Sequence, residues 1–150
     1  MNGIDLKLKD LGIVLPTPAA PVANYVPWTI SGNLVFLAGQ LPLLDGKLEG
    51  LGPVKADADG ASAARFCGIN ILAQLRQACG GDLSRVKRIV KLVGFVHAGP
   101  GVNIPAVVNG CSNLMVEVFG EAGKHARSAV GVAALPLGAP VEVEAIVEIA

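Results

Sequence analysis

The sequence predicts an α+β fold, in which one mixed β-sheet carries two helices packed on one of its faces. β-Rich runs alternate with two segments of helical periodicity, in the order β-β-α-β-α-β-β, or β-β-α-β-α-β plus an extra piece if the tail strands differ in length. Several strands are apolar on both alternating faces, which is typical of strands that are covered on both sides. The 150 residues show no internal repeat and no linker, so we expect a single domain over residues 1–150.

The chain begins with a Pro- and Ala-rich lead-in over residues 1–24. In the next stretch, "YVPWTISGNLVFLAGQLP" (25–42), two β-rich runs flank Ser31-Gly32-Asn33. Glycine and asparagine tolerate the positive φ that hairpin turns require, so this stretch predicts a β-hairpin. The following "LLDGKLEGLGP" (43–53) is punctuated by glycines and is expected to be a loop.

Two segments have the periodicity of amphipathic helices. The first runs from Asp59 to about Cys79 and ends at Gly80-Gly81, since glycine commonly terminates helices. The second follows the loop "GPGVN" and ends at Gly120. Its apolar face is expected to consist of Val107, Val108, Cys111, Leu114, Met115 and Val118.

A strand is expected over residues 84–98, between the two helices. Its side chains divide into two apolar sets: Ile89, Val93 and Phe95 on one face, and Val90, Leu92 and Val96 on the other. Two helices can cover only one face of the sheet, so we expect other subunits to cover the second face.

The tail predicts two final strands, over about 126–134 and 140–149, joined by "LPLGA". Alternation places Arg127 on one face with Ala129, Gly131 and Ala133, which leaves space beside the guanidinium. In the last strand a core face is expected from Val141, Val143, Ala145, Val147 and Ile149. The opposite face carries Glu142, Glu144, Ile146 and Glu148, which places two carboxylates, those of Glu142 and Glu144, about 7 Å apart.

These charged residues allow a specific chemistry. A guanidinium binds a substrate carboxylate through two parallel hydrogen bonds, and a glutamate can hold and activate water. A second carboxylate nearby would raise the pKa of that glutamate. From the residues alone, a structural ion pair between Arg127 and one of the glutamates at a subunit interface is the commoner outcome, so both interpretations stay open at this point.

Composition excludes several classes of function. Twelve basic and twelve acidic residues cancel, which disfavours nucleic-acid binding. Mean hydropathy is +0.56, but prolines and glycines interrupt the uncharged stretch from Leu11 to Leu44, so no membrane span is expected. The N-terminal "MNGIDLKLKDLG" has charges at alternating positions and no apolar segment, so no signal peptide is expected. We therefore expect a cytoplasmic protein with reduced cysteines that serve helix packing: Cys67, Cys79 and Cys111. Two histidines without ligand spacing predict no metal, and "GGDLSR" and "GPGVN" lack the phosphate-loop pattern.

Two stretches resemble the RidA/YjgF family, also known as endoribonuclease L-PSP, which has a chorismate mutase-like fold. "YVPWTISGNLVFLAGQLP" is similar to the family's tyrosine-to-"SGQ-P" hairpin. "ARSAVGVAALPLGAPVEVEAI" is similar to its C-terminal signature, an arginine, a Leu-Pro turn and a strand with alternating glutamates. The resemblance spans about residues 20–149 and points to the longer branch of the family, of about 150 residues.

The resemblance implies a homotrimer with a barrel-like assembly and three clefts at the subunit interfaces. It also implies a hydrolase: a deaminase that converts small enamine or imine carboxylates into a 2-keto acid and ammonia. Neither a metal nor an organic cofactor is implied. The expected partners are a small carboxylate and further copies of the chain, with no nucleic acid and no membrane.

Site residues follow from the same resemblance. Arg127 matches the arginine that grips the substrate carboxylate, and Glu142 matches the glutamate that positions or activates water. Tyr25 matches an aromatic residue at the cleft mouth, Gly39 lies in the hairpin whose backbone lines the site, and Asn109 matches a helix asparagine near the cleft.

The chain departs from the family pattern at four positions around these residues. Ala38 stands where active members have serine, Ala129 where several have cysteine, and Gly131 where some have a larger polar residue. His125 replaces a proline, and it is expected either to act as an acid or ligand-binding group or to be a histidine at a strand end in an interface. These departures keep a second hypothesis open, a protein that binds a small carboxylate without turnover. An endoribonuclease is the third.

Overall fold

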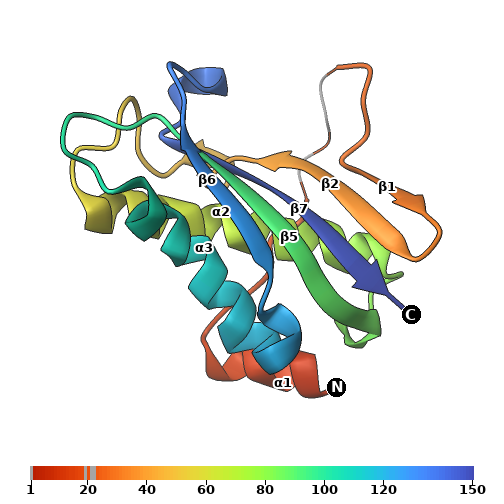
Figure 1. Ribbon diagram of the computed structural model, residues 1–150. Coiled ribbons are helices and arrows are strands. Elements are labelled where there is room, and N and C mark those ends of the chain that lie inside the picture. The colour runs from red at the N-terminus through yellow and green to blue at the C-terminus, as the bar shows by residue number, and fades with distance from the viewer. Residues whose placement is uncertain (1, 19, 21–22) are drawn as a thin grey trace.

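The computed structural model describes residues 2–18, 20 and 23–150 and confirms the α+β prediction. The five-stranded sheet has the order β1-β2-β7-β5-β6, with β6 parallel to β5 and all other neighbours antiparallel (Figure 1). Its strands are β1 (Trp28–Ser31), β2 (Leu34–Gln40), β5 (Val86–Val96), β6 (Ala126–Gly131) and β7 (Val141–Ile149).

Two helices, α2 (Asp57–Ala78) and α3 (Ile104–Phe119), lie together on one face of the sheet (Figure 1). The six apolar residues predicted to form the buried face of α3 are all buried, and Gly120 ends the helix with a φ of 61°. The alternate residues of β7 predicted for the core, from Val141 to Ile149, are buried as well. The three cysteines are buried free thiols, in keeping with a packing role.

The lead-in contains a helix that the sequence analysis did not predict. Helix α1 spans Gly3–Asp10 and packs near the end of α3 (Figure 1). Asn2 and Asp5 form a capping box, in which each side chain accepts a hydrogen bond from the other residue's backbone N–H. Leu8 on this helix is buried. The cap at Asn2 and Asp5, three residues apart, is the sequence signal that could have predicted the helix.

A second difference lies in the segment expected to be a loop. Residues Leu43–Leu44 (β3) and Lys47–Leu48 (β4) form a short antiparallel hairpin. Asp45 and Gly46 connect them with φ values of 51° and 77°. An Asp-Gly pair with two positive φ angles is the preferred two-residue hairpin turn, so local turn chemistry produces this element.

The predicted faces of β5 needed one correction. Ile89 was expected to share a face with Val93 and Phe95, but it is fully buried on the helix side with Leu92. A register shift against β7 between Ile89 and Lys91 explains this, because one extra residue in a strand reverses the alternation beyond it. Strand β6 also ends at Gly131, three residues earlier than expected.

The second face of the sheet carries no helix (Figure 1). It exposes apolar side chains, with Phe36 on β2 and Val130 on β6 at 40% and 42% exposure. Val93 and Phe95 on β5 are half-buried between these strands. We call this surface the open face. Among the described residues no helix is both long and apolar enough to cross a membrane.

The two sheet-covering helices approach each other through glycines. A Cβ added at Gly110 on α3 would overlap the backbone carbonyl of Ala61 on α2. A Cβ at Gly60 would lie 2.7 Å from a methyl group of Val107, and one at Gly68 would lie 2.8 Å from a methyl group of Leu114. The distance between the helices therefore depends on the absence of side chains at these positions.

Gly110→Ala should destabilise the protein, because the backbone of Ala61 cannot move away as a side chain could. Overpacking typically costs about 1–3 kcal/mol, and the helix propensity gained by alanine, about 1 kcal/mol, offsets only part of this. The matched control is Gly3→Ala in α1, where a Cβ would meet nothing within 4 Å. Thermal unfolding should show a lower Tm for Gly110→Ala and an unchanged or higher Tm for Gly3→Ala. Equal effects would contradict the glycine contact.

Candidate functional site

Glu142 lies on the central strand β7, beside an irregularity in β2. Leu37 is paired with Ala145 and Gln40 with Val143, so three steps along β2 match two along β7. The extra residue is accommodated at Ala38-Gly39, where the Glu142 side chain lies against the Gly39 backbone. A Cβ at Gly39 would be only 2.6 Å from Glu142 Oε2. Glycine at this position therefore makes room for the carboxylate.

A small cavity of about 150 Å³ adjoins this carboxylate. Among the residues around it are four of the predicted site residues, namely Tyr25, Ala38, Gly39 and Glu142. Gln74 of α2 and Pro136 of the loop before β7 also contribute to its wall. We call this cavity with its lining residues the glutamate pocket. Tyr25 is 57% exposed, so the pocket has an aromatic side chain at its surface.

The Glu142 carboxylate is half-buried, and no described residue forms a hydrogen bond or an ion pair with it. Burial raises the pKa of Glu142 above its ordinary value, and the negative charge of Glu144 on the same strand face raises it further. The sequence analysis expected the second effect, while the larger one, burial, comes from the tertiary structure. A carboxyl group with a raised pKa is suited to exchange protons with a water molecule.

Arg127 lies on β6 and reaches the neighbouring helix α3. Its Nη1 donates to Asn109 Oδ1 at 2.7 Å and to Ser112 Oγ at 3.2 Å. Within the described chain no carboxylate is close enough to form an ion pair with Arg127. The alternative interpretation, a structural ion pair with a glutamate at a subunit interface, stays a prediction, since it concerns a contact between two copies of the chain. Within one chain the described partners of the guanidinium are the neutral oxygens of Asn109 and Ser112.

His125 joins the same group of residues. Its Nε2 lies 2.9 Å from Ser112 Oγ, and its Nδ1 lies 2.6 Å from the carbonyl oxygen of Gly123. We call Asn109, Ser112, His125 and Arg127 the arginine cluster. Ser112 was not predicted from the sequence, although its spacing of three residues from Asn109 places both on one face of the helix.

The side chains of Glu142 and Arg127 project from opposite faces of the sheet. Arg127 is paired with Leu92 on β5, and Leu92 is paired with Ala145, both on the helix-covered face. Glu142 is paired with Phe95, on the open face. β5 separates the two strands, so Arg127 and Glu142 are two strand spacings apart, about 10 Å, in addition to their offset along the strands. One chain does not bring these two side chains together.

The remaining predicted residues belong to the arginine side. Ala129 is paired with Gly94, packs against the core and shares the face of Arg127. Gly131 lies next to Ile104 at the start of α3, where a Cβ would be 3.0 Å from the Ile104 methyl group. The expected space beside the guanidinium is therefore partly filled by α3.

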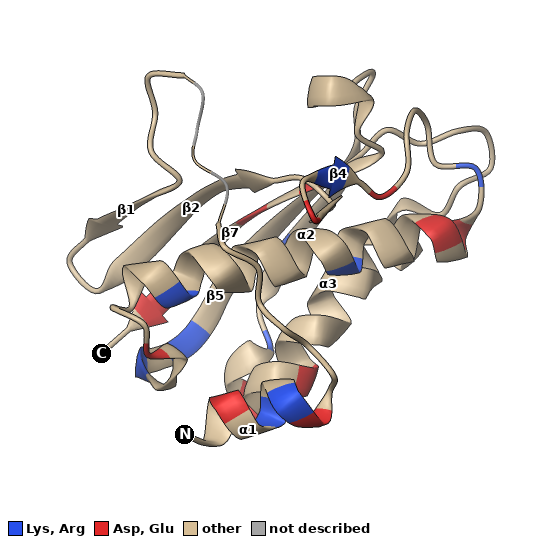
Figure 2. Cartoon of the chain, turned by 180° about the vertical axis from the view of Figure 1, so that it is seen from behind, with Lys and Arg blue, Asp and Glu red and all other residues tan. Residues whose placement is uncertain are grey.

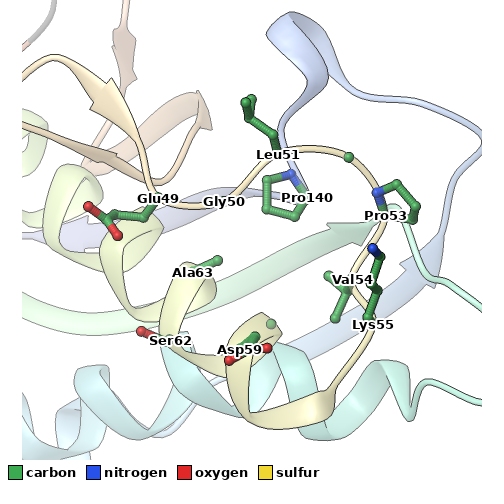
Figure 3. Close-up of a pocket in the computed structure, with 12 residues that line it drawn as sticks. Glu49, Gly50, Leu51, Pro53, Val54, Lys55, Asp59, Ser62, Ala63 and Pro140 are labelled. Carbon is green, nitrogen blue, oxygen red and sulfur yellow. The ribbon is translucent and has the colours of Figure 1, made fainter.

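A larger cavity of about 380 Å³ lies elsewhere, between the 49–55 segment, the start of α2 and Pro140 (Figure 3). Glu49 and Lys55 lie at opposite ends of the segment that borders it (Figure 3). None of the site residues predicted from the sequence lines this cavity. Across the described residues, no group of three or more histidine, cysteine or acidic side chains could hold a metal ion.

Glu142→Gln should stabilise the protein at neutral pH. Because the pKa of Glu142 is raised by folding, the folded state binds a proton more tightly than the unfolded state. The free energy of unfolding therefore falls as pH rises from the ordinary glutamate pKa, about 4.3, through the raised value. Glutamine does not titrate, so Glu142→Gln loses no free energy of unfolding at this position over the same pH range.

The measurement is Tm as a function of pH by circular dichroism. The Tm of Glu142→Gln should exceed that of the wild type at pH 7, and the difference in Tm should disappear below about pH 4, where both side chains are neutral. Glu49→Gln removes the same charge from an exposed loop and should change stability by less than about 0.5 kcal/mol. A lower Tm for Glu142→Gln at pH 7 would contradict the assigned environment.

Comparisons with known proteins agree with this architecture. The model of the YjgF/chorismate mutase-like endoribonuclease family matches residues 5–149. Protein TCP17 of Trypanosoma cruzi is 49% identical over 147 residues, which cover 95% of this chain and 91% of TCP17. The crystal structure of Atu1372 from Agrobacterium tumefaciens, a protein of unknown function, is 49% identical with a TM-score of 0.91, covering 98% of this chain and 92% of that one.

A second similar structure is that of Escherichia coli TdcF with bound serine. It is 25% identical with a TM-score of 0.66, over 89% of this chain and 94% of TdcF. The family match extends over almost the whole chain and includes the β1–β2 hairpin, both sheet-covering helices and the tail strands that carry Arg127 and Glu142. The chain therefore belongs to the RidA/YjgF family, with its chorismate mutase-like fold.

Proposed function

We propose that this protein hydrolyses small enamine or imine carboxylates to a 2-keto acid and ammonia, without a cofactor. The observation that carries the proposal is a pair of opposite charges, neither of which has an ion-pair partner. Arg127 has neutral oxygen partners and no carboxylate within the described chain, and Glu142 is half-buried without a hydrogen-bond partner there. Leaving a half-buried carboxylate unpaired is unfavourable, and functional sites are where proteins most often retain such groups.

The reaction divides naturally between these residues. The guanidinium of Arg127 binds the substrate carboxylate, and Glu142 holds a water molecule near the imine carbon. Water adds to the C=N carbon and gives one proton through Glu142 to the nitrogen, which yields a carbinolamine. The carbinolamine hydroxyl then gives its proton to the nitrogen by the same route, the C=O bond forms, and the C–N bond breaks to release ammonia. A carboxyl group whose pKa is raised toward neutrality can both accept and return this proton.

The site is completed by a second copy of the chain in this proposal. Arg127 and Glu142 project from opposite faces of one sheet, so a substrate that touches both must lie between two subunits. The exposed apolar side chains of the open face, Phe36 and Val130, support its burial against other copies. We therefore propose a homotrimer of single-domain subunits, as the resemblance of the sequence implied.

The substrate class is supported by a relative. TdcF of Escherichia coli was solved with bound serine, a small molecule that carries both a carboxylate and a nitrogen on the adjacent carbon. An imine or enamine carboxylate has the same arrangement. Ligand recognition through one carboxylate fits the single guanidinium of the arginine cluster.

A specific observation favours a second candidate, binding of a small carboxylate without turnover. Ala38 in the glutamate pocket and Ala129 on the face of Arg127 provide neither the hydroxyl nor the thiol that the family resemblance places around the ligand. An endoribonuclease activity, which the family description names, has less support. Net charge is zero, and both α1 and α2 carry acidic as well as basic residues, with no continuous basic stripe in this view (Figure 2).

Arg127→Ala should lower kcat/KM for 2-imino acids at least about 100-fold, because it removes a bidentate, charge-assisted contact that anchors the substrate. The measurement is keto-acid formation from imines generated in situ, with light scattering to show that the oligomer persists. Arg76→Ala, on α2 and outside both clusters, is the matched control and should retain activity. Wild-type protein that binds a 2-keto acid but turns over none of a panel of 2-imino acids would select the binding function instead.

A further inference from the structure

A chain of hydrogen bonds runs from the backbone of Gly123 to Arg127. The carbonyl oxygen of Gly123 can only accept, so His125 Nδ1, at 2.6 Å, must carry a hydrogen. In the neutral imidazole Nε2 is then an acceptor, and Ser112, at 2.9 Å, must donate its hydroxyl hydrogen to it. The serine oxygen consequently faces Arg127 Nη1 with its lone pairs. With a neutral imidazole, each donor of this series therefore points toward Gly123: Arg127 donates to Ser112, Ser112 donates to His125, and His125 donates to the carbonyl.

Gly123 is held in place by a close contact with α3. A Cβ at this position would overlap the carbonyl of Met115 and lie 2.9 Å from Val116 Cα. The segment before β6 therefore packs directly on the helix backbone, and Gly123 is buried. This contact fixes the carbonyl that orients His125, so the chain starts from a rigid point.

The other end of the chain determines which part of Arg127 remains available. A guanidinium has five N–H donors, two of them on Nη1. Both Nη1 hydrogens have acceptors, Asn109 Oδ1 at 2.7 Å and Ser112 Oγ at 3.2 Å. Nε and Nη2, with three hydrogens, donate to none of the residues that the structure describes. These two nitrogens form one edge of the guanidinium, which matches the two oxygens of a carboxylate.

We propose that Ser112 and His125 are positioning residues that hold Arg127 through Nη1 and thereby present its Nε–Nη2 edge to the carboxylate of the ligand. This rests on the proposed role of Arg127 as the anion anchor. His125 acts on Arg127 through Ser112, so it contributes to the orientation of the guanidinium. The site therefore takes a ligand with a single planar carboxylate, bound side-on.

The physical basis is the flexibility of arginine. Its long side chain loses considerable rotamer entropy when it is fixed in one geometry, and the planar fork is useful only when oriented. Because Arg127 donates to Asn109 and Ser112 in the folded protein, its rotamer entropy is lost on folding and not on ligand binding. Loss of Ser112 leaves one acceptor and a guanidinium that rotates about it.

The test is calorimetric binding of pyruvate, a 2-keto acid that carries one carboxylate, to the full-length protein. Ser112→Ala and His125→Phe should each weaken the Kd about tenfold, a typical effect of one hydrogen bond to a charged group. Because the two residues act in series, the double variant should be no weaker than Ser112→Ala alone, within about twofold. If the two substitutions weakened binding independently, their effects on the binding free energy would add in the double variant.

Three further variants separate positioning from folding. His125→Gln keeps an acceptor for the serine hydroxyl and should restore most of the affinity. Arg127→Lys keeps the charge without the Nε–Nη2 edge and should bind as weakly as Arg127→Ala. Asn113→Ala, an exposed neighbour of Ser112 on α3, is the matched control and should bind like the wild type. Nitrogen NMR of the His125 ring should show the Nδ1–H tautomer, and Ser112→Ala should shift the Nε2 signal.

The outcomes distinguish this inference from the proposed function. If Arg127→Ala abolishes pyruvate binding while Ser112→Ala and His125→Phe bind like the wild type, positioning is refuted and the anion anchor stands. Pyruvate binding that is unaffected by Arg127→Ala refutes both the positioning and the anchor. Imine turnover that survives in Arg127→Ala, measured separately, refutes the proposed function itself. An Nε2–H tautomer of His125 refutes the hydrogen-bond direction.

Discussion

Alternation along β7 is the constraint on which the rest of this structure depends. The strand is central, paired with β2 on one side and β5 on the other, and every second residue from Val141 to Ile149 is buried under the helices. The same alternation forces Glu142 onto the opposite, open face. Paired residues of neighbouring strands point to the same face of the sheet, so the pairing of β7 with β5 and of β5 with β6 directs Arg127 toward α3. A one-residue slip of β7 would exchange its core residues and its glutamates.

Neither Glu142 nor Arg127 has an ion-pair partner among the described residues, and a glycine allows a close contact near each of them. Glu142 lies over Gly39 at the β2 irregularity, and the segment that positions His125 lies on α3 through Gly123. Both contacts bring a polar group close to a backbone instead of pairing it with an opposite charge. The raised pKa of Glu142 means that its ionised carboxylate destabilises the folded state at neutral pH. Active sites commonly reduce the stability of a protein in this way.

The helix α3 connects the core to the candidate site. One side of it packs its six apolar residues into the core, while Asn109 and Ser112 on another side hold Arg127. The contact of α2 with α3 through Gly110 therefore also fixes the position of the arginine cluster. Any change that separates these helices is expected to move Asn109 and Ser112 relative to β6, which links core packing to ligand affinity.

Periodicity in the sequence determined the fold class, both sheet-covering helices, the first hairpin and the core face of β7, because these follow from local spacing of apolar residues. Turn and cap chemistry at Asp45-Gly46 and at Asn2 and Asp5 was also local, although the sequence analysis did not use it. The family resemblance pointed to Arg127, Glu142 and Asn109. Only the tertiary structure decided that Arg127 and Glu142 lie on opposite faces, that Ile89 turns inward and that Ser112 and His125 support Arg127. Register shifts and contacts between distant segments depend on the packing of the whole chain, and no local pattern of residues encodes them.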